Sequence, residues 1–331
     1  MKKMLIFVLI FVLLFSFSLT AKETKQVVMK LGHYGAESHP SQEASKMFAA
    51  GVETRTKGRI KVEIYPNNQL GSPPEVLEQN ILGVIDMSLP SQGQLGKYSK
   101  KFNCVMLPFA FKDYAQVDKV VDSKEFLDWA TPDLTKAGLV FLSNWEWGFR
   151  NLTNSKRPVK EPADAKGLKI RTPPELPTQA AMEAIGAIVQ TIAFNELIMA
   201  LTQGVVDGQE NPVSVIYANK IYEAKQKYLT MTGHNYGSMI HVISKKVWDK
   251  LSSEDQKIIK EESVKAGNFM RKKIRDAEAS QIEELKKLGM EVVFPDKAKF
   301  KALMGPAYDK LKDVCGEENI KALLKMIDKA K

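Results

Sequence analysis

The chain has 331 residues, of which 44% are hydrophobic and 26% are charged. This balance excludes an intrinsically disordered chain and a collagen-like fibre, because enough apolar side chains are present to form a core. The length exceeds what a single hydrophobic core usually serves, so we expect two lobes with a cleft between them. Lysine and arginine number 48 against 39 acidic residues, but the two signs are interspersed. We therefore expect solvated charged faces and no nucleic-acid partner.

The first residues have the pattern of a secretory signal peptide. Lys2 and Lys3 precede an apolar run from Met4 to Phe15, and small or polar residues follow as far as Ala21. This order is typical of a cleaved export signal, which we place at residues 1–21. The alternative is an N-terminal membrane anchor, but a helix that spans a bilayer needs about 20 apolar residues. We therefore expect a periplasmic protein.

The chain has two cysteines, Cys104 and Cys315. Neither follows the signal, so we expect no lipid-attachment cysteine. Cys104 lies in the apolar run from Phe102 to Leu107, where a buried free thiol is expected. An oxidising compartment also permits a disulfide between the two cysteines, and this alternative stays open.

The mature chain begins with the pattern of a β-α-β unit. Residues 27–31 predict a strand, apolar residues at helical spacing predict a helix over 39–58, and alternation over 60–64 predicts the next strand. A second helix over 74–82 leads into a buried strand over 83–89. This alternation predicts an α/β lobe with a largely parallel sheet, in which ligands bind at the loops beyond the strand ends.

A second α/β lobe is predicted further along the chain. After a strand over 140–144, sheet-like runs at 168–171 and 188–190 flank a helical segment. A strand over 239–243 then precedes a helical pattern that Ser253 and Gln256 cap and that continues without proline to about Leu288. A helix of about 35 residues would be roughly 50 Å long, longer than one lobe, so we expect it to brace both.

No motif in the sequence predicts catalysis or metal binding. The chain has no Gly-x-Ser-x-Gly, no phosphate-binding glycine loop with lysine, no His-Glu-x-x-His and no Cys-x-x-Cys. His234 and His241 are seven residues apart without a carboxylate at metal-ligand spacing, so we expect no zinc. We predict no cofactor and no enzymatic activity. The alternative is a periplasmic enzyme that acts on an organic acid, with His33, His39 or His234 as base.

Two arginines end strands within apolar or aromatic sequence. Arg150 closes the run Trp145-Glu146-Trp147-Gly148-Phe149-Arg150, and Arg171 lies in Gly167-Leu168-Lys169-Ile170-Arg171-Thr172-Pro173. A planar guanidinium matches a carboxylate in two parallel hydrogen bonds, which suits an organic acid. The alternative is that each arginine pairs with a structural Asp or Glu. A third segment, from Gly204 to Pro212, indicates a tight loop with outward amides.

Taken together, these segments resemble the DctP-type solute receptors of tripartite ATP-independent periplasmic (TRAP) transporters. The resemblance covers nearly the whole mature chain, in order. Its strings are Leu31-Gly32-His33, residues 58–71, Gly148-Phe149-Arg150, residues 167–173, Phe194-Asn195-Glu196-Leu197, residues 206–212 and residues 222–229.

The resemblance implies an α/β, two-lobed periplasmic-binding-protein fold with a hinge. By resemblance, one domain comprises residues 22–147 plus 237–276 and the other residues 148–236 plus 277–331. It also implies a monomeric receptor that captures a small organic acid and delivers it to a TRAP membrane permease. A ligand-binding subunit of a sensor system is the alternative.

The resemblance also implies which residues bind the ligand. Arg171 matches the arginine that pairs with the ligand carboxylate, and the second lobe further supplies Arg150, Asn211 and Phe194. The first-lobe residues expected at the cleft are His33, Tyr34, His39, Ser91 and Gln92.

Two observations bear on the ligand. Trp145 and Trp147 could wall the ligand or pack in the core. The loop over 90–94 carries no acid, which disfavours sialic acid and leaves sugar acids, hydroxy acids and oxo acids.

Overall fold

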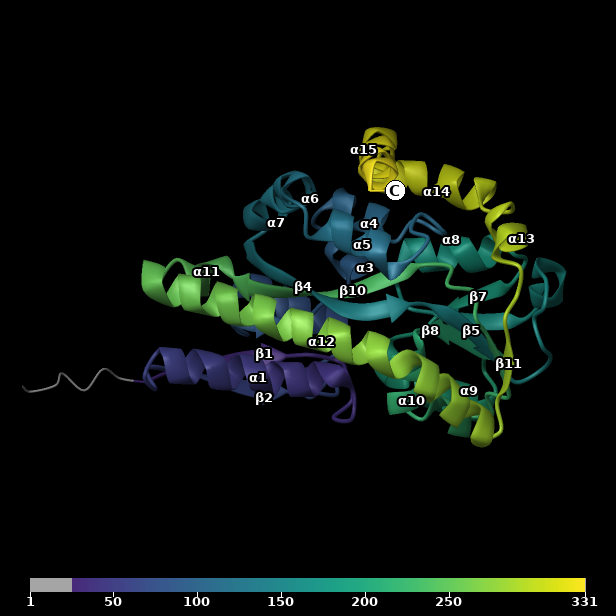
Figure 1. Cartoon of the computed structure of the whole chain (residues 1–331), viewed down its shortest axis with the longest axis horizontal. Coiled ribbons are helices and arrows are strands. Elements are labelled where there is room, and N and C mark those ends of the chain that lie inside the picture. The colour runs from purple at the N-terminus through teal and green to yellow at the C-terminus, as the bar shows by residue number, and fades with distance from the viewer. Residues whose placement is uncertain (1–25, 331) are drawn as a thin grey trace, which may run out of the picture.

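The structure is a computed structural model that describes residues 26–330. The predicted signal peptide lies outside these residues. Two β-sheets, each flanked by helices, form the two lobes of an α/β protein, which confirms the predicted fold class (Figure 1). Within residues 26–330, no helix is both long enough and apolar enough to cross a membrane.

The first sheet is parallel only in part. β1 pairs in parallel with β2 and β3, whereas β10 is antiparallel to both β3 and β4. The chain returns from the second lobe along β10, and this return makes the sheet mixed where a largely parallel one was predicted. The strand order is β2-β1-β3-β10-β4, with β1 (Val27–Gly32), β2 (Ile60–Tyr65), β3 (Met87–Ser88), β4 (Leu139–Phe149) and β10 (Tyr236–Ser244).

β3 is shorter than the strand predicted over 83–89. Gly83 ends helix α2 in the left-handed region at φ 80°, and Val84 is exposed. The apolar residues before Met87 therefore belong to a helix end and a turn, and pairing with β1 begins only at Met87.

The second sheet has the order β11-β9-β5-β8-β6-β7. β8 occupies a central place, although the sequence from Gly204 to Pro212 predicted only a loop. Its side chains, from Gln209 to Asn211, are polar yet buried, so the strand lacks the apolar run by which a sequence predicts a buried strand. The bounds are β5 (Asn151–Asn154), β6 (Lys169–Thr172), β7 (Ile188–Thr191), β8 (Gly208–Asn211), β9 (Tyr228–Thr230) and β11 (Glu291–Val293).

Short helices cover both sheets. Those before the second sheet are α1 (Pro40–Arg55), α2 (Pro73–Leu82), α3 (Gln92–Leu95), α4 (Lys100–Val105), α5 (Tyr114–Val121), α6 (Lys124–Ala130) and α7 (Pro132–Lys136). Those that follow are α8 (Leu176–Ala184), α9 (Leu197–Gln203), α10 (Val213–Ala218) and α11 (Lys245–Trp248), with 3-10 turns η1 (Pro162–Ala165), η2 (Phe194–Glu196) and η3 (Ile221–Glu223). The last are α13 (Lys297–Lys301), α14 (Gly305–Cys315) and α15 (Glu317–Lys329); α14 packs on α8 and α4, and α15 on α4, α5 and α6.

The longest helix, α12 (Ser253–Lys287), has 35 residues and runs along much of the molecule (Figure 1). It packs against α1 and β4 of the first lobe and against α10 of the second, which confirms the prediction of a helix that braces both lobes. Its cap is Ser252, whose Oγ accepts from the Asp255 amide at 3.1 Å, and not Ser253. Gly267 allows the close approach of α12 to β4, because a Cβ there would lie 2.8 Å from Trp145 Cδ1.

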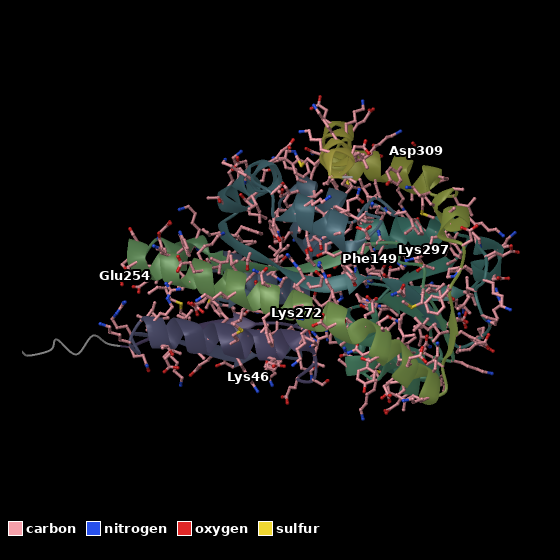
Figure 2. The ribbon with its side chains drawn as sticks, viewed as in Figure 1. Lys46, Phe149, Glu254, Lys272, Lys297 and Asp309 are labelled. Atoms are coloured by element: carbon pink, nitrogen blue, oxygen red, sulfur yellow. The ribbon has the colours of Figure 1, made fainter. Side chains whose placement is uncertain are left out.

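The chain crosses between the lobes at Arg150 and again at residues 231–235. The two crossings are joined, since the Arg150 amide donates to Asn235 O at 2.9 Å and the His234 amide donates to Arg150 O at 3.2 Å. Beside them lies a cavity of about 500 Å³ whose lining includes Phe149 and Lys297, both labelled in Figure 2. The boundaries predicted after residues 147 and 236 fall near these crossings, and the division into domains remains a prediction.

Cys104 in α4 and Cys315 at the end of α14 are buried free thiols, as predicted. They lie close together, since a hydrogen bond with Cys315, with burial added to it, raises the pKa of the Cys104 thiol. Helix α14 therefore contacts α4 of the first lobe as well as α8 of the second.

Candidate ligand-binding site

The predicted binding residues follow the carboxyl ends of strands in both sheets. His33 and Tyr34 follow β1, Ser91 and Gln92 follow β3, Arg171 is near the end of β6, Phe194 follows β7, and Asn211 ends β8. Loops beyond the carboxyl ends of parallel strands are the usual ligand-binding positions of open α/β sheets. Contacts between the lobes bring most of these side chains together.

The guanidinium group of Arg171 is fully buried, and few contacts stabilise its charge. Its Nε donates to the carbonyl oxygen of Ile192 at 2.8 Å, which fixes the plane of the group. Its Nη1 and Nη2 are buried and have no hydrogen-bond partner among residues 26–330. Burial lowers the pKa of Arg171 to about 10. Four N–H donors are therefore left without an acceptor among the residues that the structure describes.

Aromatic rings from both lobes pack around Arg171. Its guanidinium carbon lies 5.9 Å from the centre of the Phe194 ring, within the range of a cation–π contact. Tyr34 from the first lobe lies 5.7 Å from the same ring and 4.9 Å from Trp147. His39 packs on Trp147 at 4.8 Å. Phe194, Tyr34 and His39 therefore belong to one aromatic cluster with Trp147, and their contact with a ligand remains a prediction.

Arg150 differs from Arg171 because a carboxylate of the chain already holds it. Its Nε pairs with Glu210, and its Nη2 donates to Glu210 Oε1 at 2.8 Å and to Asn211 Oδ1 at 3.2 Å. Burial raises the pKa of Glu210, but the charge and hydrogen bond of Arg150 outweigh it and hold that pKa below its usual value. Arg150 therefore has the structural partner that the sequence left open as an alternative, and its contact with a ligand remains a prediction.

Asn211 and His234 complete the group around Glu210. The Asn211 amide donates to Gln209 Oε1 at 2.5 Å, so both ends of this side chain are engaged. His234 lies with Nε2 3.3 Å from Glu210 and Nδ1 2.7 Å from the Thr232 hydroxyl. Asn211 is thus positioned beside Arg150 by contacts within its own lobe.

The first-lobe residues His33, His39 and Gln92 are all buried. His33 Nε2 lies 3.0 Å from Gln42, whereas its Nδ1 is unpartnered among the described residues. His39 caps α1, and its Nε2 reaches Ser214 of the second lobe at 3.4 Å. Burial lowers the pKa of His33 to about 4 and that of His39 to about 3, where the charge of His33 adds to the effect. Both rings are therefore neutral near neutral pH.

Trp145 packs in the core, which is one of the two alternatives that the sequence left open for it, and not against the cluster around Arg171. Its ring is fully buried beneath α12, and its Nε1 donates to Ser143 Oγ at 3.0 Å and to Ser263 O at 3.1 Å. The physical reason is its place along β4. Trp147, two residues further along β4, contacts the rings of Tyr34 and Phe194.

The structure adds one charged residue that the sequence analysis missed. Glu175, the N-cap of α8, is 4% exposed, and its Oε1 accepts a hydrogen bond from Ser91 Oγ across the two lobes. The available signal was an acid in the turn Pro173-Pro174-Glu175, just past Arg171. Within residues 26–330, no group of three or more His, Cys, Asp or Glu side chains could hold a metal ion.

Two lobes, joined by crossing segments and enclosing buried, unpartnered polar groups, define a solute-binding protein of the periplasmic type. The chain matches the family model of the bacterial extracellular solute-binding proteins, family 7 (DctP), over residues 31–313, and it belongs to that family. The resemblance to DctP-type TRAP solute receptors is thereby confirmed.

Three similar proteins show the range of ligands among such relatives. The 2,3-diketo-L-gulonate-binding periplasmic protein YiaO of Escherichia coli is 34% identical over 80% of each chain. The C4-dicarboxylate-binding periplasmic protein DctP of Rhodobacter capsulatus is 30% identical over 90% of each chain. A TRAP periplasmic solute binding protein from a Polaromonas strain, solved with D-erythronate, is 36% identical; the match covers 90% of this chain and 98% of that one, with a TM-score of 0.86.

Proposed function

We propose that this protein is an extracytoplasmic receptor that binds a small organic acid between its lobes and delivers it to a TRAP membrane permease. The observation that carries the ligand class is the buried Arg171 guanidinium, whose Nη1 and Nη2 lack partners among the described residues. A carboxylate matches these two nitrogens in geometry and charge. The similar proteins whose names give carboxylates as ligands support the same class.

Closure of the lobes would couple ligand binding to a change of shape. A ligand shifts a two-state equilibrium only as far as it prefers one state. Both lobes contribute side chains around Arg171, so a bound acid would touch both and favour the closed arrangement. The permease would recognise that arrangement. We further propose a periplasmic, monomeric protein with a cleaved signal peptide.

The enzyme alternative is less well supported by the histidines. A general base works best when its pKa lies near the working pH. The pKa values of His33 and His39 lie at about 4 and about 3, and both ring nitrogens of His234 are engaged. The sensor alternative differs in its partner alone, so co-purification with the two membrane subunits of a TRAP permease would separate it from the receptor.

Calorimetric titration with a panel of organic acids tests the ligand class. We expect at least one small carboxylate to bind the wild type and to lose affinity by roughly 30-fold or more in Arg171→Ala, as expected for truncating one partner of a desolvated charge pair. Arg171→Lys should restore little, because an ammonium cannot present two parallel donors. Lys169→Ala is the matched control, since Lys169 is an exposed cation on the same strand. Affinity within threefold of wild type in Arg171→Ala would contradict the proposal.

A further inference from the structure

Glu175 and Arg171 both carry unsatisfied polar groups in the buried region between the lobes. Glu175 Oε1 accepts from Ser91 of the opposite lobe, but Glu175 Oε2 is buried without a partner among residues 26–330. A buried carboxylate oxygen without a hydrogen bond is costly, so we expect a group other than the described residues to complete it.

Of the four charged side chains in this region, two form an ion pair and two do not. Arg150 and Glu210 neutralise each other as a buried pair. Arg171 and Glu175 do not form such a pair, although the charge of Arg171 still acts to lower the pKa of Glu175. Burial raises the pKa of Glu175, and the charge of Arg150, the Ser91 hydroxyl and Arg171 oppose this only in part. The region therefore offers hydrogen-bond donors at Arg171 and a hydrogen-bond acceptor at Glu175.

The first lobe adds an unsatisfied donor on Gln92, whose chain neighbours Ser91 and Gly93 both lie against Glu175. Gln92 Oε1 accepts from the Ser238 amide and from Ser238 Oγ, the latter at 2.8 Å, so its orientation is fixed. Its Nε2 is buried and unpartnered within the described chain. Gly93, the next residue, lies against Glu175, because a Cβ on it would stand 2.7 Å from Glu175 Oε2. Glycine at this position thus lets the carboxyl group of Glu175 approach the start of α3.

We propose that Glu175, aided by Gln92, makes the receptor select acids that carry hydroxyl groups and reject dicarboxylates; this rests on the proposed function, since the ligand carboxylate is placed at Arg171. The hydroxyl groups of such an acid can donate to Glu175 Oε2 and accept from Gln92 Nε2, because a hydroxyl is both a donor and an acceptor. A second carboxylate would meet Glu175 in a desolvated space, where like charges repel strongly. An acid without hydroxyl groups would leave Glu175 Oε2 without a donor, and sites built to bind a hydroxyl discriminate strongly against its absence.

Matched acids of equal chain length test this selection by calorimetry. The four-carbon set is D-erythronate, butyrate and succinate, and the six-carbon set is D-galactonate, hexanoate and adipate. In at least one set we expect the hydroxy acid to bind the wild type at least tenfold more tightly than both partners. In Glu175→Gln, which removes the charge and keeps the shape, the preference over the dicarboxylate should shrink by tenfold or more. Glu196→Gln, which neutralises an exposed acid near Arg171, should leave the ranking unchanged.

The outcomes separate this inference from the function on which it rests. If no carboxylate in either set or in the wider panel binds, the proposed function fails and the inference fails with it. If succinate or adipate binds the wild type as tightly as the matched hydroxy acid, the receptor function stands and the selection by Glu175 is overturned. The wild-type ranking is decisive on this point even if Glu175→Gln does not fold. A folded Glu175→Gln protein with an unchanged ranking would also overturn the inference.

Discussion

Replacing Arg171 by methionine should separate the cost of burying its charge from its use in binding. Methionine keeps an unbranched apolar stem but removes the guanidinium, whose Nη1 and Nη2 have no partners among residues 26–330. An unsatisfied buried polar group costs about 1–3 kcal/mol, so two nitrogens amount to roughly 2–6 kcal/mol when the lobes close without a ligand. That cost should hold the free wild type open, and the carboxylate should remove it.

The Arg171→Met protein should therefore close more readily on its own. We expect its radius of gyration without ligand, measured by small-angle X-ray scattering, to approach that of the ligand-bound wild type. Its thermal midpoint should not fall, whereas its affinity for the acid should drop by the roughly 2–5 kcal/mol expected for a lost desolvated pair. Lys169→Ala serves again as the control. A free variant as expanded as the free wild type, or destabilised by more than about 5 °C, would show that Arg171 has structural partners and would refute the reasoning.

Three further predictions concern the core. Thiol counting in denaturant without reductant should find both Cys104 and Cys315 free, and fewer than about one thiol per chain would contradict the structure. Trp145→Phe should lose two buried hydrogen bonds and about 1–3 kcal/mol of stability with affinity unchanged, whereas Trp147→Ala should weaken binding; an affinity loss in Trp145→Phe alone would return that residue to the site. Burial lowers the pKa of His241 to about 3, with the charge of Lys260 adding to it, so the unfolded state, at about 6.5, binds the proton first. The contribution of His241 to stability is thus complete above pH 6.5 and is lost as the pH falls toward 3; thermal melts from pH 7.5 to 5 should decline less steeply in His241→Gln than in the wild type, and equal slopes would contradict this.

Much of the fold followed from patterns that are local in sequence. Apolar periodicity predicted β1, β2, α1 and α2, and the uninterrupted pattern of α12 predicted both its length and its role of bracing two lobes. Periodicity works here because a buried face repeats every two or 3.6 residues, whatever the partner is. It failed at β8, whose buried side chains are polar and are satisfied by other buried polar groups.

Arg171 illustrates how far the sequence reaches into the site. Its motif indicated an arginine at a strand end that is suited to a carboxylate. Arg150 had an equivalent sequence context, yet tertiary packing supplied it with Glu210 as a partner and left Nη1 and Nη2 of Arg171 without one among residues 26–330. The partner of a buried charge depends on which strand lies beside it. Arg150 directly precedes β5, and Glu210 lies on β8, which is the neighbour of β5 in the sheet.

By itself, the sequence determined the class of protein, the two α/β lobes, the long helix and the arginine most suited to an acid. Only the tertiary structure decided that Trp145 packs beneath α12 whereas Trp147 packs against Tyr34, that Cys104 and Cys315 are neighbours, and that Glu175 meets Ser91. Each of these depends on contacts between segments far apart in the chain. Local periodicity indicates whether a side chain is buried, but the packing of the lobes and helices determines which groups surround it.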